Sequence, residues 1–375
     1  MKQDKVKCIK TQQEKDYIWQ IIFKVGLTFL FVSLFLMAFI LGNGKAYFYD
    51  TVYVSKFINQ PFQFHTINIV QGDSFLIKFP DDKTMLVDTG ENDNYPVLKS
   101  YLKQYFKNEK LNQIDYFVLT HQDSDHLGSA DLVLRDFKVN KVFRPKVKSL
   151  YEKENSIISE NYEICETESY NNFTITLHQK NINYAFSERG IVLSGGGYKV
   201  EFLSPSEDKY SYSNDYSAVL MITYQDKKFL LMGDATTQIE DELKDFYQDN
   251  LKADVLKLAH HGSKTSTSES FLDIVKPKYA ILSVGKNNSN LPSSDVINRL
   301  NDKKIPIYST QKEGNFAFCI QNGNIVQSSE EGRNKTLPFL ASLLIIGVSL
   351  VWGIKFKKKE NGKSANMIVE NNILC

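Results

Sequence analysis

The amino-acid sequence predicts an α/β sandwich that lies between two membrane-spanning helices. Over residues 63–328, short apolar runs of period two alternate with longer stretches of helical period, which is typical of strands and helices packed in layers. Two uncharged apolar segments, 25–42 and 337–354, flank this region, and each is about as long as a bilayer-spanning helix. A third observation is that aspartate and histidine residues gather directly after the expected strands.

The composition excludes several classes of protein. Of the 375 residues, 42% are hydrophobic and 13% are aromatic, so the chain can bury a large core and is not globally disordered. The four cysteines show no Cys-x-x-Cys spacing and are too few for a disulfide scaffold, although Cys165 and Cys319 could pair in an oxidising exterior. Residues 43–332 carry 32 Lys or Arg against 39 Asp or Glu. This acidic excess weighs against a broad basic face for nucleic acid.

The lysines that flank the apolar segments predict their orientation. They precede 25–42 and follow 337–354, and short basic segments stay on the cytoplasmic side of a membrane. A cleaved secretory signal is the alternative for the first segment, and a wall-sorting signal is the alternative for the second. The chain is therefore expected to comprise a cytoplasmic tail (1–24), a transmembrane helix (25–42), a linker (43–62), an extracytoplasmic domain (63–328), a transmembrane helix (337–354) and a cytoplasmic basic tail (355–375).

The elements of the outer domain follow from periodicity. Strands are expected at 64–70, 74–79 and 84–87, then a helix at 95–108, a strand at 116–120 and a helix from Leu127. Residues 150–190 are polar and their elements are hard to assign, and the isolated His65 and His178 are interpreted as ordinary strand residues. The remaining elements are strands at 199–203, 217–224 and 228–232, a helix at 236–247, a strand at 254–259, a helix at 268–275, a strand at 278–284 and a helix at 293–302.

Four potential metal ligands follow the strand at 116–120 within six residues. They are His121, Asp123, Asp125 and His126. Imidazole with carboxylate suits divalent cations such as Zn²⁺ or Mn²⁺, and the aspartate at position 123 shifts the preference toward Mn²⁺. The alternative is a solvated turn in which Asp125 caps the next helix. Four such side chains together favour a metal site.

This run resembles the His-x-His-x-Asp-His signature of the metallo-β-lactamase superfamily, with Asp123 in place of the second histidine. In this form it is similar to the soluble domain of the ComEC family of competence DNA-uptake channels. The likeness extends over 63–325. Where that family has His-Pro, this chain reads Asn290-Leu291-Pro292, so a site for one ion instead of two is an alternative. Its further motifs occur in the same order: 67–74 with Val70 in place of glycine, 86–90, 214–220, 231–234 and 254–263.

The resemblance implies an αββα fold, one or two divalent ions and additional site residues. Asp234 stands where the superfamily has a bridging aspartate, and Asp215 stands near a metal-binding histidine of ordinary members. A helix N-cap is the alternative for Asp234, and a turn is the alternative for Asp215. His261 is the expected ligand of the His260-His261 pair, whereas His260 is expected to donate a proton or stabilise the transition state, unless both are structural. Asp88 is expected to orient the metal loop.

The implied reaction is hydrolysis by activated water, with Asp125 and His260 as catalytic residues. Three functions remain open. The first is an extracytoplasmic phosphodiesterase or nuclease of ComEC type, with DNA as substrate and the bilayer as partner. The second is a phosphodiesterase for cell-envelope polymers, because residues 264–266 after the histidines also resemble phosphorylcholine esterases. The third is a membrane-tethered binding or sensing domain with a degenerate metal site.

Overall fold

The N-terminal helix α1 spans Lys2–Leu41 and belongs to one of the two units into which the chain divides. The computed structural model describes residues 2–41, 57, 59–285 and 290–329. Within α1, the stretch Glu14–Leu34 is long and apolar enough to cross a membrane, with a mean hydropathy of 1.7. The helix thus includes most of the expected cytoplasmic tail (1–24) as well as residues 25–41 of the expected span 25–42. The second expected span, 337–354, lies outside the described residues.

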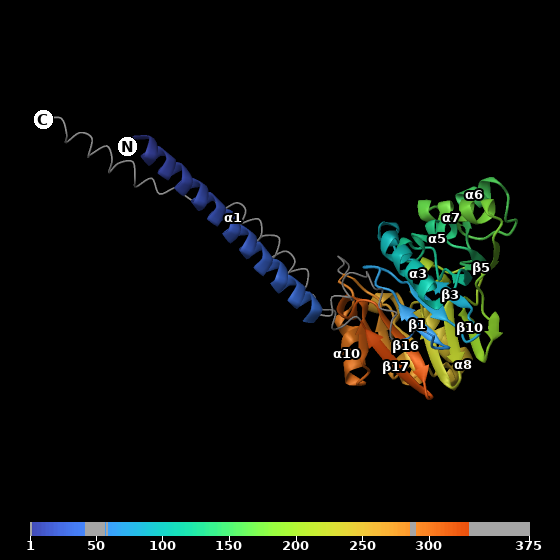
Figure 1. The fold of residues 1–375 in the computed structure, drawn as a ribbon. Coiled ribbons are helices and arrows are strands. Elements are labelled where there is room, and N and C mark those ends of the chain that lie inside the picture. Colours follow the sequence, from blue (N-terminus) through green and yellow to red (C-terminus); the bar gives the residue numbers. More distant parts are fainter. Residues whose placement is uncertain (1, 42–56, 58, 286–289, 330–375) are drawn as a thin grey trace. The chain divides into compact units, whose positions relative to one another are not determined.

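The other unit, Thr51–Glu331, contains two large β-sheets (Figure 1). The first has the strand order β17-β16-β1-β2-β3-β4-β5-β8, and the second has the order β15-β14-β13-β12-β11-β10-β9. Strands β3, β4, β5 and β8 run parallel to one another, as do β12, β13, β14 and β15. The strands of the first sheet are β1 (Gln63–Thr66), β2 (Phe75–Lys78), β3 (Thr84–Val87), β4 (Ile114–Val118), β5 (Val139–Arg144), β8 (Asn183–Phe186), β16 (Phe316–Gln321) and β17 (Asn324–Ser329). Those of the second are β9 (Val192–Gly195), β10 (Tyr198–Ser204), β11 (Val219–Tyr224), β12 (Lys227–Leu231), β13 (Val255–Lys257), β14 (Tyr279–Leu282) and β15 (Ile307–Ser309).

The alternation of side chains along the strands creates two cores. Phe75 and Ile77 of β2 join Phe229 of β12 in a buried cluster between the sheets, whereas Leu76 and Leu230 point the other way, into a cluster shared with the helices. Figure 1 shows α3, α5 and α7 on one side of the sheets and α8 and α10 on the other. The helices are α3 (Tyr95–Glu109), α4 (Ser124–Leu127), α5 (Ala130–Asp136), α6 (Leu150–Glu154), α7 (Glu168–Gln179), α8 (Thr237–Tyr247), α9 (Glu269–Val275), α10 (Ser294–Asp302) and α11 (Thr310–Glu313). These are the expected αββα layers.

Two expectations from the sequence were wrong, and a stretch that the sequence left unassigned is structured. The first strand ends at Thr66, because the alternation of Ile67 and Ile69 continues into a loop in which the exposed Val70 has a left-handed φ of 70°. The polar stretch 150–190 is structured: it contains α6, α7, β8 and strand β7 (Ile164–Cys165), which pairs with β6 (Lys148–Ser149). His178 lies in α7, not in a strand, and Cys165 and Cys319 are separate buried thiols.

A buried arginine ties this polar stretch to the first sheet. The guanidinium of Arg144 in β5 contacts both carboxylate oxygens of Glu152 at 2.7 and 3.1 Å, and both side chains are fully buried. Glu152 also contacts Nε2 of His178 at 2.7 Å and caps α6 through Ser149. Burial raises the pKa of Glu152, but its bonds from His178 and Arg144 outweigh this effect and place the pKa below its ordinary value of 4.5.

Candidate metal centre

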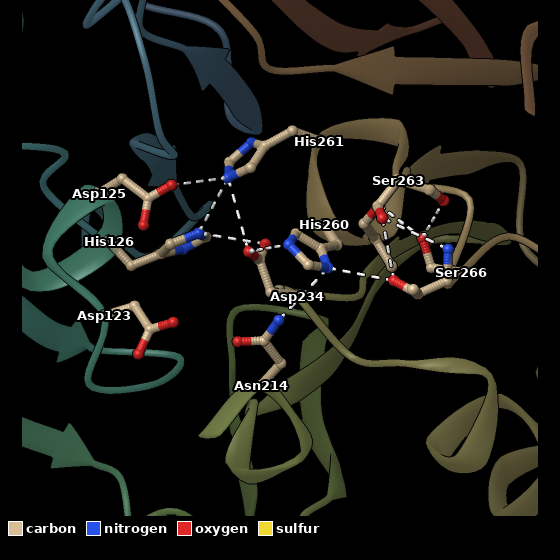
Figure 2. A network of polar contacts seen from close by, with 12 residues as sticks. Asp123, Asp125, His126, Asn214, Asp234, His260, His261, Ser263 and Ser266 are labelled. Atoms are coloured by element: carbon tan, nitrogen blue, oxygen red, sulfur yellow. Dashed lines mark hydrogen bonds and ion pairs between the residues drawn. The ribbon is translucent and has the colours of Figure 1, made fainter. Parts of the chain in front are cut away.

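Loops at the carboxyl ends of parallel strands bring carboxylates and imidazoles from both sheets together. Asp125 and His126 follow β4 of the first sheet, whereas Asp234 and His261 follow β12 and β13 of the second. Figure 2 shows these four side chains converging on one place. We call them the central group. One ligand atom from each lies within 4.8 Å of the others, so the group matches the donor set of a divalent metal site.

The distances within the central group show how close the potential ligands are. Nε2 of His126 lies 3.2 Å from Nε2 of His261 and 3.1 Å from Oδ1 of Asp234. Nε2 of His261 lies 3.2 Å from Oδ2 of Asp125 and 3.6 Å from Oδ2 of Asp234. Asp125 is partly exposed and the other three are buried.

The hydrogen bonds of His126 and His261 show that the central group is suited to bind a cation. Nδ1 of His126 donates to Oδ2 of Asp88 at 2.8 Å, and Nδ1 of His261 donates to the carbonyl oxygen of Ser283 at 2.7 Å. In the neutral imidazoles both Nε2 atoms are therefore lone-pair donors that face each other and two carboxylates. A cation between them relieves this repulsion. The residues present thus fit a divalent ion.

His121 and Asp123 lie beside the central group. Nε2 of His121 is 3.7 Å from Oδ2 of Asp123 and 3.9 Å from Oδ2 of Asp234, and it is buried without a hydrogen-bond partner in the part of the chain that the structure describes. Asp234, a member of the central group, thus has one carboxylate oxygen near His121 and the other near His126. A buried imidazole nitrogen without a partner is costly, and a second ion that shares Asp234 would satisfy it.

The charges of the site shift its pKa values. Burial lowers the pKa of His126, but the carboxylates of Asp234 and Asp125 outweigh it and place the pKa well above the ordinary value. Burial also lowers the pKa of His261, but the carboxylate of Asp234 outweighs this effect and raises the pKa above the ordinary value. Burial raises the pKa of Asp234, yet His126 and His261 outweigh it and place the pKa well below the ordinary value. Burial lowers the pKa of His121 to about 3, so its imidazole is neutral, which is the form that binds metals.

Backbone features around the site position its ligands. Oδ1 and Oδ2 of Asp88, at the end of β3, accept hydrogen bonds from the backbone N (2.8 Å) and Oγ1 (2.6 Å) of Thr120, so the carboxylate is fixed where it meets His126. A Cβ at Gly72 would lie 1.8 Å from the carbonyl oxygen of Asp125, which explains why this turn needs glycine. Asp125 lies inside the short helix α4, and Asp123 occupies the N-cap position of that helix, so Asp125 is not its cap.

The histidine pair consists of two consecutive residues with left-handed backbone, and their side chains lie in different surroundings. His260 and His261 have φ values of 47° and 50°, and the backbone N of His260 donates to the carbonyl oxygen of Gly233 at 3.1 Å. His261 is buried in the central group, whereas the side chain of His260 is 29% exposed. Nδ1 of His260 accepts from the amide of Asn214 at 3.3 Å, so in the neutral ring Nε2 carries the proton. That nitrogen lies 3.9 Å from Oδ2 of Asp234.

The helix-cap alternative for Asp234 is excluded, because the N-cap of α8 is Thr236. Among the described residues, Asp215 is not part of the central group. Asp215 lies in the short helix η2 (Ser213–Tyr216), and its Oδ1 accepts hydrogen bonds from the backbone N and Oγ1 of Thr236 at 3.3 and 2.7 Å. Its Oδ2 is buried and has no hydrogen-bond partner among the described residues.

Sequence reasoning assigned no role to Asp73 or Lys257, which form a buried ion pair directly behind the central group. Oδ2 of Asp73 lies 3.8 Å from Nδ1 of His126, and its Oδ1 lies 3.7 Å from Nδ1 of His261. The signal was available: Asp73 follows a turn glycine, and Lys257 is a charged residue inside the apolar run Val255–Leu258.

A family model described as the metallo-β-lactamase superfamily matches residues 67–286. The chain belongs to the metallo-β-lactamase superfamily. The superfamily consists in general of metal-dependent hydrolases, and its fold binds divalent metals such as zinc. The motif-based resemblance to ComEC proteins is also confirmed, because the similar curated proteins include competence proteins.

Two relatives illustrate this likeness. ComE operon protein 3 of Bacillus subtilis is 28% identical over 270 residues, which cover 68% of this chain and 33% of that protein. Recombination protein 2 of Haemophilus influenzae is 27% identical over 302 residues, or 80% of this chain and 34% of that protein. This superfamily member thus matches about a third of the length of these relatives. The solved metallo-β-lactamase fold protein YhfI from Bacillus subtilis is 11% identical, with a TM-score of 0.42 over 68% of this chain and 98% of that chain.

Proposed function

We propose that this chain is a membrane-anchored, extracytoplasmic, metal-dependent phosphodiesterase that cleaves nucleic acid in the manner of the ComEC soluble domain. The central group carries the proposal, because it places two carboxylates and two imidazoles from separate loops within reach of one ion. The similarity to competence proteins supports DNA as the substrate class. Asp123, in place of the usual histidine, adds a hard oxygen ligand suited to Mn²⁺.

We assign the steps of hydrolysis to individual side chains of the site. The central group would hold one ion, and His121 and Asp123 would hold a second through the shared Asp234, with Asp215 as a further proposed ligand. Such ions would supply a Lewis acid for a phosphoryl oxygen and would lower the pKa of a water nucleophile. Asp125, partly exposed, is the carboxylate placed to orient that water. His260 presents its Nε2 proton toward the site and can give it to the leaving oxygen.

Cleavage by the full-length chain in detergent tests the proposal. The substrates are a labelled single-stranded oligonucleotide and p-nitrophenyl phosphorylcholine, each with Mn²⁺, Zn²⁺ or a chelator. We expect metal-dependent cleavage of the oligonucleotide that stops with the chelator. Absence of cleavage with either metal, together with metal content well below one ion per chain, would refute the proposal and favour a sensing domain with a degenerate site.

A substitution separates the role of His260 from that of the metal ligands. His260→Gln keeps the polar contacts but removes the proton donor, so kcat should fall about 10²–10⁴-fold while metal content stays at the wild-type level. Loss of bound metal in this variant would instead identify His260 as a ligand. A full wild-type kcat would exclude the proton-donor role.

An envelope phosphodiester is the second candidate substrate, and two observations favour it. The outer region has the acidic excess described above, which opposes long nucleic acids. Lys264 and Thr265 are exposed beside His260, with Oγ1 of Thr265 at 3.3 Å from its Nδ1, and could contact a small phosphodiester. Faster cleavage of the phosphorylcholine ester than of the oligonucleotide would select this alternative.

The proposed topology has α1 as an anchor, residues 1–24 and 355–375 in the cytoplasm, 43–62 as linker and 337–354 as a second span. The domain 63–328 would then face outward. Protease added to intact cells is expected to degrade the domain. Protection of the domain until the membrane is opened would contradict the extracytoplasmic placement.

A further inference from the structure

A second group of metal-type side chains shares His126 with the central group. Asp73 and Asp88 lie on the side of its Nδ1, at 3.8 and 2.8 Å, and one ligand atom from each of the three residues lies within 4.8 Å of the others. All three residues are buried. We call them the Asp73 group. Two carboxylates and an imidazole at this spacing could also bind a divalent ion, in competition with the central group.

A lysine ammonium already pairs with the Asp73 group. Lys257, at the end of β13, has a side chain that is 1% exposed, and its Nζ forms an ion pair with Oδ2 of Asp73. Its second contact is the carbonyl oxygen of Gly233, at 3.4 Å. Neither oxygen of Asp73 has a hydrogen-bond partner among the residues that the structure describes, so this ion pair supplies its counter-charge. Burying a lysine is costly, and an apolar side chain could fill the same volume.

The charge of Lys257 influences which nitrogen of His126 can bind a metal ion. An ion held by the Asp73 group needs the lone pair of Nδ1, and this nitrogen now donates its proton to Asp88. With Asp73 neutralised by Lys257, the Asp73 group attracts a dication less strongly. His126 can then keep its Nδ1 proton, and its Nε2 stays available to the central group.

We propose that Lys257 is an internal cation that keeps divalent ions out of the Asp73 group and thereby directs His126 to the central group. Lys257 is in this sense a positioning residue, because it acts through Asp73 and His126. The inference rests on the metal binding of the proposed function and is independent of the substrate.

Metal stoichiometry of the full-length chain in detergent tests this role. Wild type, Lys257→Met and the double variant Lys257→Met/Asp73→Asn are saturated with Mn²⁺, desalted and measured by elemental analysis. Lys257→Met is expected to hold about one more ion per chain than wild type, because Asp73 is left with a free charge beside Asp88. The double variant is expected to return to the wild-type count. Lys278→Met, which breaks an ion pair with Asp254 at the surface, is the matched control and should not change the count.

Three results would overturn the inference. The first is an unchanged or lower metal count in folded Lys257→Met. The second is an extra ion that persists in the double variant. The third is failure of both Lys257→Met and Lys257→Gln to fold even in excess Mn²⁺, since a bound ion should replace the missing charge. Turnover enters none of these measurements. A wild type that binds no metal would refute the proposed function, whereas equal counts in wild type and Lys257→Met would refute only the role of Lys257.

Discussion

Replacing Asp88 by asparagine removes a charge behind the metal centre at nearly constant side-chain size. The carboxylate accepts hydrogen bonds from Nδ1 of His126 at 2.8 Å and from the N and Oγ1 of Thr120 at 2.8 and 2.6 Å. An amide has one acceptor atom for these three donors, so its NH₂ group must face a donor. His126 then loses its fixed orientation, and its Nε2 becomes a weaker ligand. Substitutions of such outer partners weaken metal binding by about 10–100-fold, or about 1.4–2.8 kcal/mol.

Competition with a chelating fluorescent dye measures this loss for Mn²⁺ and Zn²⁺, on the full-length chain in detergent. Asp226→Asn is the matched control, because Asp226 lies in the turn between β11 and β12 and forms an exposed ion pair with the neighbouring Lys227. The control should bind metal as wild type does. An affinity of Asp88→Asn within about twofold of wild type would show that Asp88 does not orient His126.

Four further substitutions test other parts of the structure. Asp125→Ala and Asp234→Ala are each expected to abolish hydrolysis while thermal unfolding stays cooperative, and normal turnover at saturating Mn²⁺ would contradict their assignment as ligands. Glu152→Gln leaves the buried guanidinium of Arg144 without its carboxylate and should lower the free energy of unfolding by about 3–5 kcal/mol in urea titrations; a loss below about 1 kcal/mol would contradict this. Because the folded-state pKa of Glu152 lies below 4.5, its stabilisation is present above that pH and is lost as the pH falls through the folded pKa, so wild type and Glu152→Gln should converge in acid. Val70→Gly relieves a left-handed β-branched residue and should raise the stability by about 1 kcal/mol, seen as a higher melting midpoint; an unchanged or lower midpoint would show that no strain is stored there.

Much of the fold could be predicted because its strands carry strong local signals. The apolar runs Phe75–Ile77 of β2 and Phe229–Leu231 of β12 are the signal of strands that are buried on both faces. The stretch 150–190 could not be predicted in this way. Its order depends on the buried contact of Arg144 with Glu152, which joins residues from separate elements, and a polar sequence does not reveal such a partnership.

The candidate site was predictable where its carboxylates follow an apolar strand, as Asp125 and Asp234 do. The geometry that distinguishes His260 from His261 was not, because it depends on two left-handed residues, which local sequence preferences disfavour. Lys257 is visible in the sequence as a charge inside an apolar strand, but its partner is not, because only the arrangement of the two sheets brings its ammonium to Asp73.

The division of the central group between the two sheets links the ion to the lifetime of the whole domain. An ion that binds the folded state and not the unfolded chain adds stability that grows with the logarithm of its free concentration. Here that ion would clasp one half of the sandwich to the other. Where divalent metal is scarce, the domain would lose this stabilisation together with its activity. Scarcity of the metal would therefore shorten the lifetime of the folded protein as well as inactivate it.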